Sequence, residues 1–301
     1  MEDWDNLRVF LAVARSGQFL AASRRLKLDH ATVARRIAAL EAEAKVLLFQ
    51  RRTTGAVLTS AGEKLFSYAE AIEANVVNAT EELANKVAVS GTVRIAAPEG
   101  FVSYFLVPRL AAFVRLYPDA ILQLVPLART FSLARREADI AIMIDRPKQG
   151  RLTVKKLTDY GVSLYASRGH LQASGPIRSE EDLADRTLVT FVDDLVYSSS
   201  LDYAQPLLHA VRNRFECVSV VAQIEAIRAG VGAGVIHDYA AQQFPDLVRV
   251  LPSFSAERTY WIVTHKAERT LRRVAATHAF IESEVKRTGG LFFKQNSSVA
   301  T

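Results

Sequence analysis

The stretch "RRLKLDHATVARRIAALE", residues 24–41, decides how the N-terminal part of the chain folds. It joins the end of one helical pattern to a second one, with the break "LDH" between them. Each residue of an α-helix turns the side-chain direction by about 100°, so apolar residues that share a direction form a buried stripe. Arg35 lies almost opposite to the stripe of the second helix, whereas Arg36 lies beside it. The stripe is predicted to consist of Val33, Ile37, Leu40 and Ala44.

The outward face of this second helix is unusual for a surface that faces water. It consists of Ala31, Ala34 and Ala38 around Arg35, with Thr32 at its edge. Such a face suits close approach: in a major groove, alanine methyl groups can contact thymine methyls, and the guanidinium can bind guanine or phosphate. A helix that packs within its own protein can show the same pattern, so the pattern alone leaves both alternatives open.

The neighbouring segments favour DNA binding. A short helix over residues 19–26, a tight turn and the helix after "LDH" predict a helix-turn-helix, and Asp29 can cap the second helix. The segment "LLFQRRTTGAVLTSAG", residues 47–62, predicts a hairpin with Gly55 at its turn. Cations and hydroxyls near the tip of such a wing can reach backbone phosphates. The residues predicted to contact DNA are Asp29, His30, Ala31, Thr32, Ala34, Arg35, Arg36, Arg51, Arg52, Thr53 and Thr54.

One long helix is predicted for residues 60–89. Ser60 with Glu63 forms a capping box at its start, and Thr59 is the alternative cap. Apolar residues then alternate at spacings of four and three, which is the pattern of a coiled-coil seam. We expect this seam to pair with the same helix of a second copy, and packing on its own domain is the alternative. The seam residues are Leu65, Ala69, Ile72, Val76, Ala79 and Leu83.

Composition points to a folded intracellular protein with an anionic partner. The 301 residues suggest two or three units, and 50% of them are hydrophobic, which is enough for a proper core. Residues 1–60 carry a net charge of +4 out of +6 for the whole chain. The acidic start "MEDWDNLRVF" does not resemble a signal peptide, and no apolar run reaches the roughly 18 residues of a membrane span. Cys217 is the only cysteine, which suits a reducing cytoplasm.

Alternating strand and helix patterns begin at residue 92, and this order is typical of βα units with a mostly parallel sheet. About 200 residues of this kind form either one domain or two lobes. The strands "YGVSLYAS" and "TYWIVTHK" are expected to be matched, and the final helix "TLRRVAATHAFIESEV" to return to the first lobe. Helical runs include "PEGFVSYFLVPRLAAFVRLYP" and "SLARREA". The other predicted strands are "TVRIAA", "AILQLVPL", "DIAIMI", "TLVTFV" and "VSVVA".

These segments together resemble the LysR-type transcriptional regulators, over nearly the whole chain and in order. The resemblance implies a winged helix-turn-helix, a linker helix that forms dimers, and a two-lobed effector-binding domain like that of periplasmic solute-binding proteins. It also implies homotetramers on promoter DNA and autoregulation. The matching segments are "NLRVFLAVARSGQFLAASRRL", "TVARRIAALE", "LLFQRR", "LTSAG", "GTVRIAAPEG", "VPRLAAFVRLYPD", "DIAI" and "RAGVGAGVI".

On this basis the chain is predicted to be α/β overall, with three parts. Residues 1–60 form the winged helix-turn-helix DNA-binding domain, residues 61–90 the linker and dimerisation helix, and residues 91–301 the effector-binding domain. Within that domain, lobe I is expected to take in about 91–161 and 266–290, and lobe II about 162–265.

Five positions depart from the family pattern. Lys27 and Lys45 stand where glycine is usual, and because both places favour φ > 0, local strain or a shifted turn is expected. Serine is usual at the positions of Gln18, Asp29 and Ala34. Asp29 caps well, but its charge faces phosphates if it points at DNA. These departures concern the details of base recognition and not the fold.

The effector site is predicted between the lobes, at carboxyl ends of strands and at helix N-termini. Family members that bind carboxylates often have Ser or Thr near "APEGFVS", residues 97–103, where this chain has Glu99. Glu99 argues against a simple anion clamp unless it points away or caps the helix. Each candidate can equally be a residue that only completes its loop. The candidates are Pro98, Glu99, Gly100, Phe101, Ser103, Arg129, Thr130, Arg146 and Gln223.

Catalysis finds little support in the sequence. No G-x-S-x-G, H-E-x-x-H or phosphate-loop motif occurs, and the six histidines are scattered without metal-ligand spacing. We therefore predict a cytoplasmic regulator that is not an enzyme and has no metal or cofactor, with double-stranded promoter DNA and a small-molecule effector as partners. The rival hypothesis is a cytoplasmic solute-binding or enzymatic α/β protein whose N-terminal segment is only a docking domain.

Overall fold

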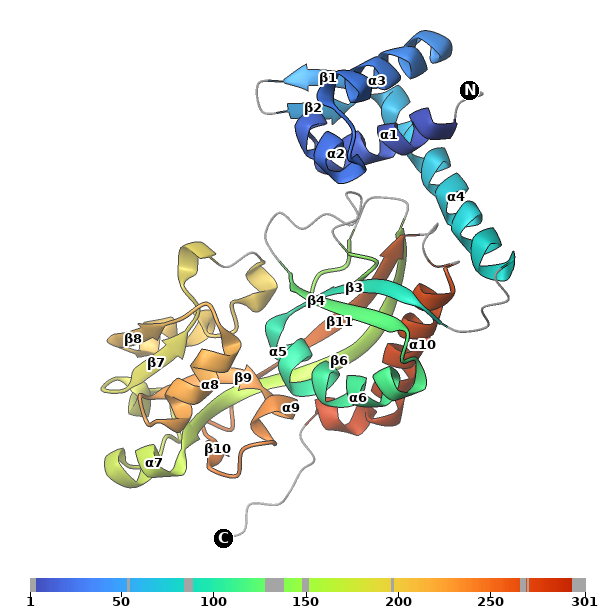
Figure 1. Ribbon diagram of the computed structural model, residues 1–301. Helices are drawn as coiled ribbons and strands as arrows, with labels where there is room; N and C mark the ends of the chain where they lie inside the picture. The colour runs from blue at the N-terminus through green and yellow to red at the C-terminus, as the bar shows by residue number, and fades with distance from the viewer. Residues whose placement is uncertain are drawn as a thin grey trace.

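The structure is a computed structural model of the chain (Figure 1). It describes residues 4–52, 55–83, 89–127, 138–147, 152–195, 198–265, 269 and 271–293. Within these residues the chain forms a small helical unit at the N-terminus, a long helix, and a larger unit built on one sheet. None of the described helices has the length and apolar character needed to cross a membrane.

The N-terminal unit consists of three helices and a hairpin that enclose one small core. Phe10 is at its centre, with its ring 5.3 Å from that of Phe49 and 6.5 Å from that of Phe66. These rings join the first helix, the hairpin and the long helix. The elements are α1 (Trp4–Ser16), α2 (Phe19–Leu26), α3 (His30–Ala44), β1 (Phe49–Arg52), β2 (Gly55–Leu58) and the long helix α4 (Ser60–Leu83).

Lysines in the left-handed conformation end both helices of the helix-turn-helix. Lys27, after α2, has φ 55°, and Lys45, after α3, has φ 53°. At α2 the N–H groups of Lys27 and Leu28 return to the carbonyls of Arg24 and Ser23. This pattern closes a helix end most easily with glycine. The sequence prediction of φ > 0 at both lysines is therefore confirmed.

The hairpin is an antiparallel wing that docks on the turn between α1 and α2. Arg52 pairs with Gly55 across the hairpin, so Gly55 begins β2 just after the loop. The N–H of Ala56 donates to the carbonyl of Gly17 over 2.7 Å. A Cβ atom on Gly55 would lie 2.3 Å from that same carbonyl oxygen, so only glycine allows this approach.

The long helix α4 begins with a cap from Thr59 and not from Ser60, because Thr59 Oγ1 accepts from the N–H of Gly62 over 3.0 Å. Its first half packs on the N-terminal unit, where Arg15 of α1 pairs with Glu73 over 2.6 Å. Glu70 is fully buried and lies 3.4 Å from His265 of the larger unit. The first half of α4 thus connects to both units of the chain.

The larger unit is a twisted sheet of nine described strands with helices on its faces (Figure 1). Its hydrogen-bonded order is β4-β3-β5-β11-β6-β9-β7-β8, with β10 beside β6. The strands are β3 (Gly91–Ala97), β4 (Ala120–Pro126), β5 (Ile140–Met143), β6 (Leu152–Ser167), β7 (Thr187–Thr190), β8 (Asn213–Glu216), β9 (Ala233–His237), β10 (Leu247–Arg249) and β11 (Ser255–His265).

Two long antiparallel strands, β6 and β11, run between the two lobes of this unit. They confirm the expected matched pair, and they correct the expectation of a mostly parallel sheet. Within each lobe the pairing of β3 with β4 and of β7 with β8 is parallel. The register of β6 and β11 shifts between Tyr260 and Trp261, and such an irregularity bends the strands at this point.

Helices cover both lobes, and one of them corrects a predicted strand. The segment "VSVVA" is not a strand, because Ser219 caps a helix that starts at Val220. The predicted helix "SLARREA" lies largely outside the described residues. The helices are α5 (Glu99–Phe101), a π-helical segment (Val102–Leu106), α6 (Val107–Leu116), α7 (Arg168–Ser174), α8 (Val220–Arg228), α9 (Asp238–Ala241) and α10 (Arg272–Arg287).

The π-helical segment has an identifiable cause. Pro108 has no N–H, so the carbonyl of Tyr104, four residues earlier, receives no helical hydrogen bond from it. The side-chain amide of Gln243 donates to that carbonyl instead, over 2.7 Å. Because Gln243 follows α9, this bond fixes the helical run that begins at Glu99 against the part of the chain after β9.

Candidate DNA-binding face and inter-lobe cavity

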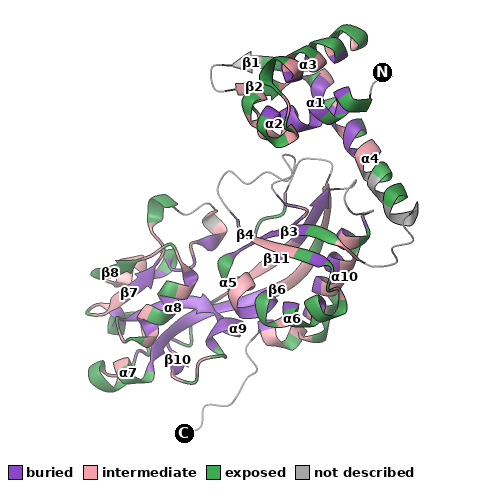
Figure 2. Ribbon diagram, in the orientation of Figure 1, coloured by how far each residue is buried: buried purple, intermediate pink, exposed green. Residues whose placement is uncertain are grey.

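Helix α3 presents one side to the core and the other to solvent (Figure 2). Val33, Ile37 and Leu40 are buried, as the sequence predicts, and Ala44 is half-buried. Arg35 is exposed on the opposite side. The exposed or half-buried small residues around Arg35 are Ala31, Ala34 and Ala38.

The N-terminus of α3 is closed by its own turn. Asp29 accepts two hydrogen bonds from Thr32, one from its N–H over 2.7 Å and one from its hydroxyl over 2.6 Å. The bond from the hydroxyl, followed by that from the N–H, holds the pKa of the Asp29 carboxyl below its ordinary value. His30 begins the helix, and its exposed ring lies 6.2 Å from that of Phe19. The side chains of Asp29 and Thr32 are thus hydrogen-bonded to each other.

The remaining predicted DNA contacts differ in their setting. Arg36 is half-buried and pairs with Asp5 of α1 over 3.2 Å, so it fastens α3 to α1. Arg51 and Arg52 belong to strand β1 of the wing. The residues at its tip, Thr53 and Thr54, lie outside the described residues.

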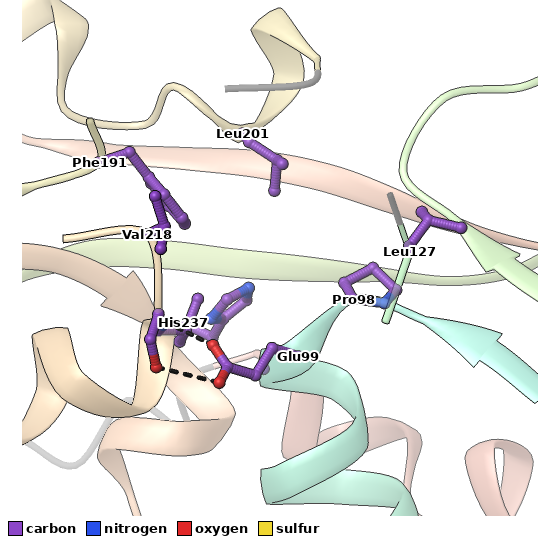
Figure 3. A pocket seen from close by; sticks show the side chains of 10 residues that line it. Pro98, Glu99, Leu127, Phe191, Leu201, Val218 and His237 are labelled. Atoms are coloured by element: carbon purple, nitrogen blue, oxygen red, sulfur yellow. Dashed lines mark hydrogen bonds between the residues drawn. The ribbon is translucent and has the colours of Figure 1, made fainter. Parts of the chain in front are cut away.

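A cavity of about 300 Å³ lies between the two lobes (Figure 3). Its size is at the lower end of the range for small-molecule sites, about 300–1,000 Å³. Side chains from both lobes contribute to it, and most of its wall is apolar. The lining residues are Pro98, Glu99, Gly100, Leu127, Phe191, Leu201, Val218, Ser219, Val220 and His237.

Glu99 of lobe I reaches across this cavity to lobe II. Its carboxylate accepts from the Ser219 hydroxyl over 3.0 Å and from the Val220 N–H over 2.6 Å. Ser219 also caps α8 itself, by accepting from the N–H of Ala222 over 3.2 Å. The N-terminus of α8 therefore has two caps, one from its own turn and one from the opposite lobe.

His237 lies beside Glu99 in the cavity wall and is only 3% exposed (Figure 3). Burial lowers the pKa of its imidazole to about 4, so the ring is uncharged near neutral pH. The ring centroid lies 5.2–5.6 Å from those of Tyr160, Tyr203 and Tyr239. A Cβ atom on Gly100 would lie 2.8 Å from the imidazole, so glycine is needed at this position.

A second bridge joins the lobes away from Glu99. Asp145 follows β5 in lobe I, and its carboxylate accepts from the hydroxyls of Ser198 and Ser200 in lobe II. Carboxylates of one lobe thus meet hydroxyls of the other at two places. In the described part of the chain, no cluster of His, Cys, Asp and Glu side chains is suited to hold a metal ion.

Two family models match the chain. Residues 4–63 match the model described as "Bacterial regulatory helix-turn-helix protein, lysR family", and residues 87–286 match the "LysR substrate binding domain". The chain belongs to the LysR family of transcriptional regulators. The LysR-type helix-turn-helix is the one that holds α3, so the rival hypothesis of a mere docking domain is not supported.

Named proteins agree with this LysR assignment. The chain is 27% identical over 283 residues to the glycine cleavage system transcriptional activator of Escherichia coli, covering 91% of each protein. It is 29% identical over 181 residues to the HTH-type transcriptional regulator PtxR of Pseudomonas aeruginosa, covering 60% of this chain and 58% of that protein. The crystal structure of ArgP from Mycobacterium tuberculosis shares its fold, with a TM-score of 0.70, 20% identity, and coverage of 98% and 100%.

The structure brings together only some of the predicted effector residues of this LysR protein. Pro98, Glu99 and Gly100 line the cavity. Phe101 is instead in the core, its ring 5.0 Å from that of Tyr260. Ser103, in the π-helical segment, is not among the lining residues.

Arg146 and Gln223 are also not among the residues that line the cavity. The Arg146 guanidinium lies 5.3 Å from the ring centre of Trp261, outside the cavity lining. Gln223 is buried within α8, and its amide donates to the carbonyl of Cys217 over 2.7 Å. Arg129 and Thr130 lie outside the described residues.

The sequence prediction missed His237, Ser219 and the apolar wall. Ser219 stands directly before an apolar helical run, and that N-cap signal was available in the sequence. His237 ends a buried strand, where a lone histidine gives no distinguishing signal.

Proposed function

We propose that this LysR-type regulator binds promoter DNA through the outward face of α3 and changes its activity when a small molecule enters the inter-lobe cavity. The observation that carries the proposal is the face itself: Arg35 stands exposed among small alanines, on a helix whose other side is locked in the core. A face without long side chains can approach base edges, and the guanidinium can bind guanine. The wing strand with Arg51 and Arg52 supplies cations for the neighbouring phosphates.

The domain limits follow the same proposal. Residues 1–60 bind DNA, residues 61–90 link and dimerise, and residues 91–301 bind the effector.

The predicted dimer seam along α4 divides into two parts. Ala69, in its first part, is buried in the core of the N-terminal unit, with Leu65 and Ile72 packed against it. Val76 is 57% exposed and Ala79 is exposed, which supports pairing with a second copy along the later part of α4.

Dimer formation explains how two recognition helices reach two half-sites on one face of the duplex. We further propose a cytoplasmic location and a regulatory role without catalysis. Promoter DNA is a cytoplasmic partner in bacteria, and the family model matched by residues 4–63 describes regulatory proteins.

The test is retention of the DNA fragment upstream of the protein's own gene. Arg35→Ala is expected to weaken binding about tenfold or more, because each specific arginine contact contributes about 1–3 kcal/mol. Arg212→Ala is the matched control, since Arg212 is an exposed arginine in lobe II and should leave binding unchanged. Affinity of the parent should fall steeply with salt. Equal binding by Arg35→Ala and the parent would show that α3 is not the recognition helix.

A further inference from the structure

The wall of the inter-lobe cavity is mainly hydrocarbon. Leu127 and Leu201 are 9% and 6% exposed, and Phe191 and Val218 complete the apolar surface from lobe II. None of the described lining residues carries a positive charge. A wall of this kind stabilises a ligand through burial of its apolar surface and not through an ion pair.

The place where an anion would bind is already filled by the protein. Helix N-termini attract carboxylates, because their free N–H groups and the helix dipole favour negative charge. At α8 the carboxylate is that of Glu99, bound to the Val220 N–H over 2.6 Å and to the Ser219 hydroxyl over 3.0 Å. A carboxylate ligand beside it would meet a like charge and no free helix terminus.

One polar side chain of the cavity has no partner. Neither ring nitrogen of His237 forms a hydrogen bond with the described residues; Nδ1 is fully enclosed, so Nε2 is the nitrogen that a ligand in the cavity can contact. A buried polar atom without a partner carries a desolvation cost that a bound ligand can relieve. Because burial keeps this imidazole uncharged, Nε2 offers either a donor or an acceptor, according to the tautomer, to an uncharged group.

We propose that the cavity takes an uncharged, largely apolar molecule whose single hydroxyl, carbonyl or amide group hydrogen-bonds to His237, while Glu99 holds the N-terminus of α8 and excludes carboxylates. This inference rests on the proposed function, since it names the chemical class of the effector. An apolar cavity of about 150 Å³ accommodates benzene. The volume of about 300 Å³ found here therefore suits a fused or substituted aromatic ring.

The test compares two probes of the same shape, 2-naphthol and 2-naphthoate, by calorimetric titration of the full chain at neutral pH. We expect 2-naphthol to bind at least about tenfold more tightly, because only the naphthoate brings a second negative charge to Glu99. Stronger binding of 2-naphthoate, or binding of neither probe at millimolar concentration, would overturn the proposal.

Substitutions at Glu99 and His237 test whether these two residues cause the preference for 2-naphthol. Glu99→Gln removes the charge and keeps the shape, so 2-naphthoate should gain affinity while 2-naphthol changes little. Asp185→Asn removes an exposed carboxylate elsewhere in lobe II and should alter neither probe. His237→Phe should weaken 2-naphthol, and His237→Asn, which keeps a hydrogen-bonding group, should recover part of the loss. A Glu99→Gln protein with an unchanged ratio of the two affinities would contradict the assignment.

The two proposals can fail separately. A parent protein that retains its promoter fragment but prefers 2-naphthoate refutes the ligand class and leaves the regulatory function standing. A parent protein that binds 2-naphthol as expected but retains no DNA supports the ligand class and refutes the proposed function.

Discussion

Helices α3 and α8 both begin with a side-chain cap, but the origin of their caps differs. Asp29 closes α3 from within its own turn, three residues before its partner Thr32. The N-terminus of α8 is closed by its own Ser219 and by Glu99, which is more than a hundred residues away in sequence and belongs to the other lobe.

Because of this difference, the cap of α3 does not depend on the positions of the lobes, whereas one of the two caps of α8 does. The cap of α3 lies within residues 29–32, so opening of the lobes does not remove it. Opening the lobes would remove Glu99 from α8 and leave Ser219 as its remaining cap. The stability of α8 is therefore coupled to closure of the cavity, as a switching domain requires.

The largest effect is expected from Asp29→Ala, because both oxygens of this carboxylate serve the helix end and nothing replaces them. The melting temperature of the N-terminal unit should fall by several degrees in calorimetry. The folded-state pKa of Asp29 is lowered, so its contribution is complete above about pH 4 and is lost as the pH falls through that lowered value.

Asp29→Asn is the control, since asparagine caps a helix without a charge. It should retain most of the stability at neutral pH and remove the part of the acid dependence that Asp29 contributes. An unchanged melting temperature for Asp29→Ala would show that α3 does not depend on its local cap.

A smaller effect is expected at α8, where two caps share one helix end. Ser219→Ala alone should cost about 0.5 kcal/mol in urea unfolding, the low end for a lost cap, because Glu99 still holds the Val220 N–H. Combined with Glu99→Gln, the loss should exceed the sum of the two single losses. Strict additivity would mean that the two caps act independently.

The smallest effect concerns the other end of α3, where Lys45 adopts φ 53°. Lys45→Gly should stabilise the N-terminal unit by about 0.5 kcal/mol, because glycine adopts this conformation without steric cost. Lys64→Gly, within α4, should instead destabilise it by about 1 kcal/mol. If both substitutions changed the free energy of unfolding in the same direction, Lys45 would not be strained.

The sequence predicted features that depend on near neighbours. The buried stripe of α3, its cap at Asp29 and the left-handed lysines all follow from the chemistry of a few adjacent residues. The first half of the predicted dimer seam was ambiguous for a physical reason: Leu65, Ala69 and Ile72 have helical spacing whether they face a second copy or the core of their own domain.

Features that depend on distant residues escaped prediction. Glu99 was expected to matter, but its partners Ser219 and Val220 become visible only when the lobes are assembled. The run "VSVVA" has the composition of a strand, and its helical state is decided by the cap at Ser219 and by packing of α8 on the sheet. Gln223 was predicted on that wrong basis.

The two tryptophans of this chain divide between its two units. Trp4 begins α1 and is 61% exposed, whereas Trp261 sits at the bend of β11, beneath the guanidinium of Arg146. Indole emission depends on the polarity around the ring, so the protein contains one natural optical reporter in the DNA-binding unit and another in the larger unit, between β5 and β6. Replacing Trp4 with phenylalanine leaves Trp261 as the single indole emitter, so a change in the surroundings of its ring can be followed in the unlabelled protein.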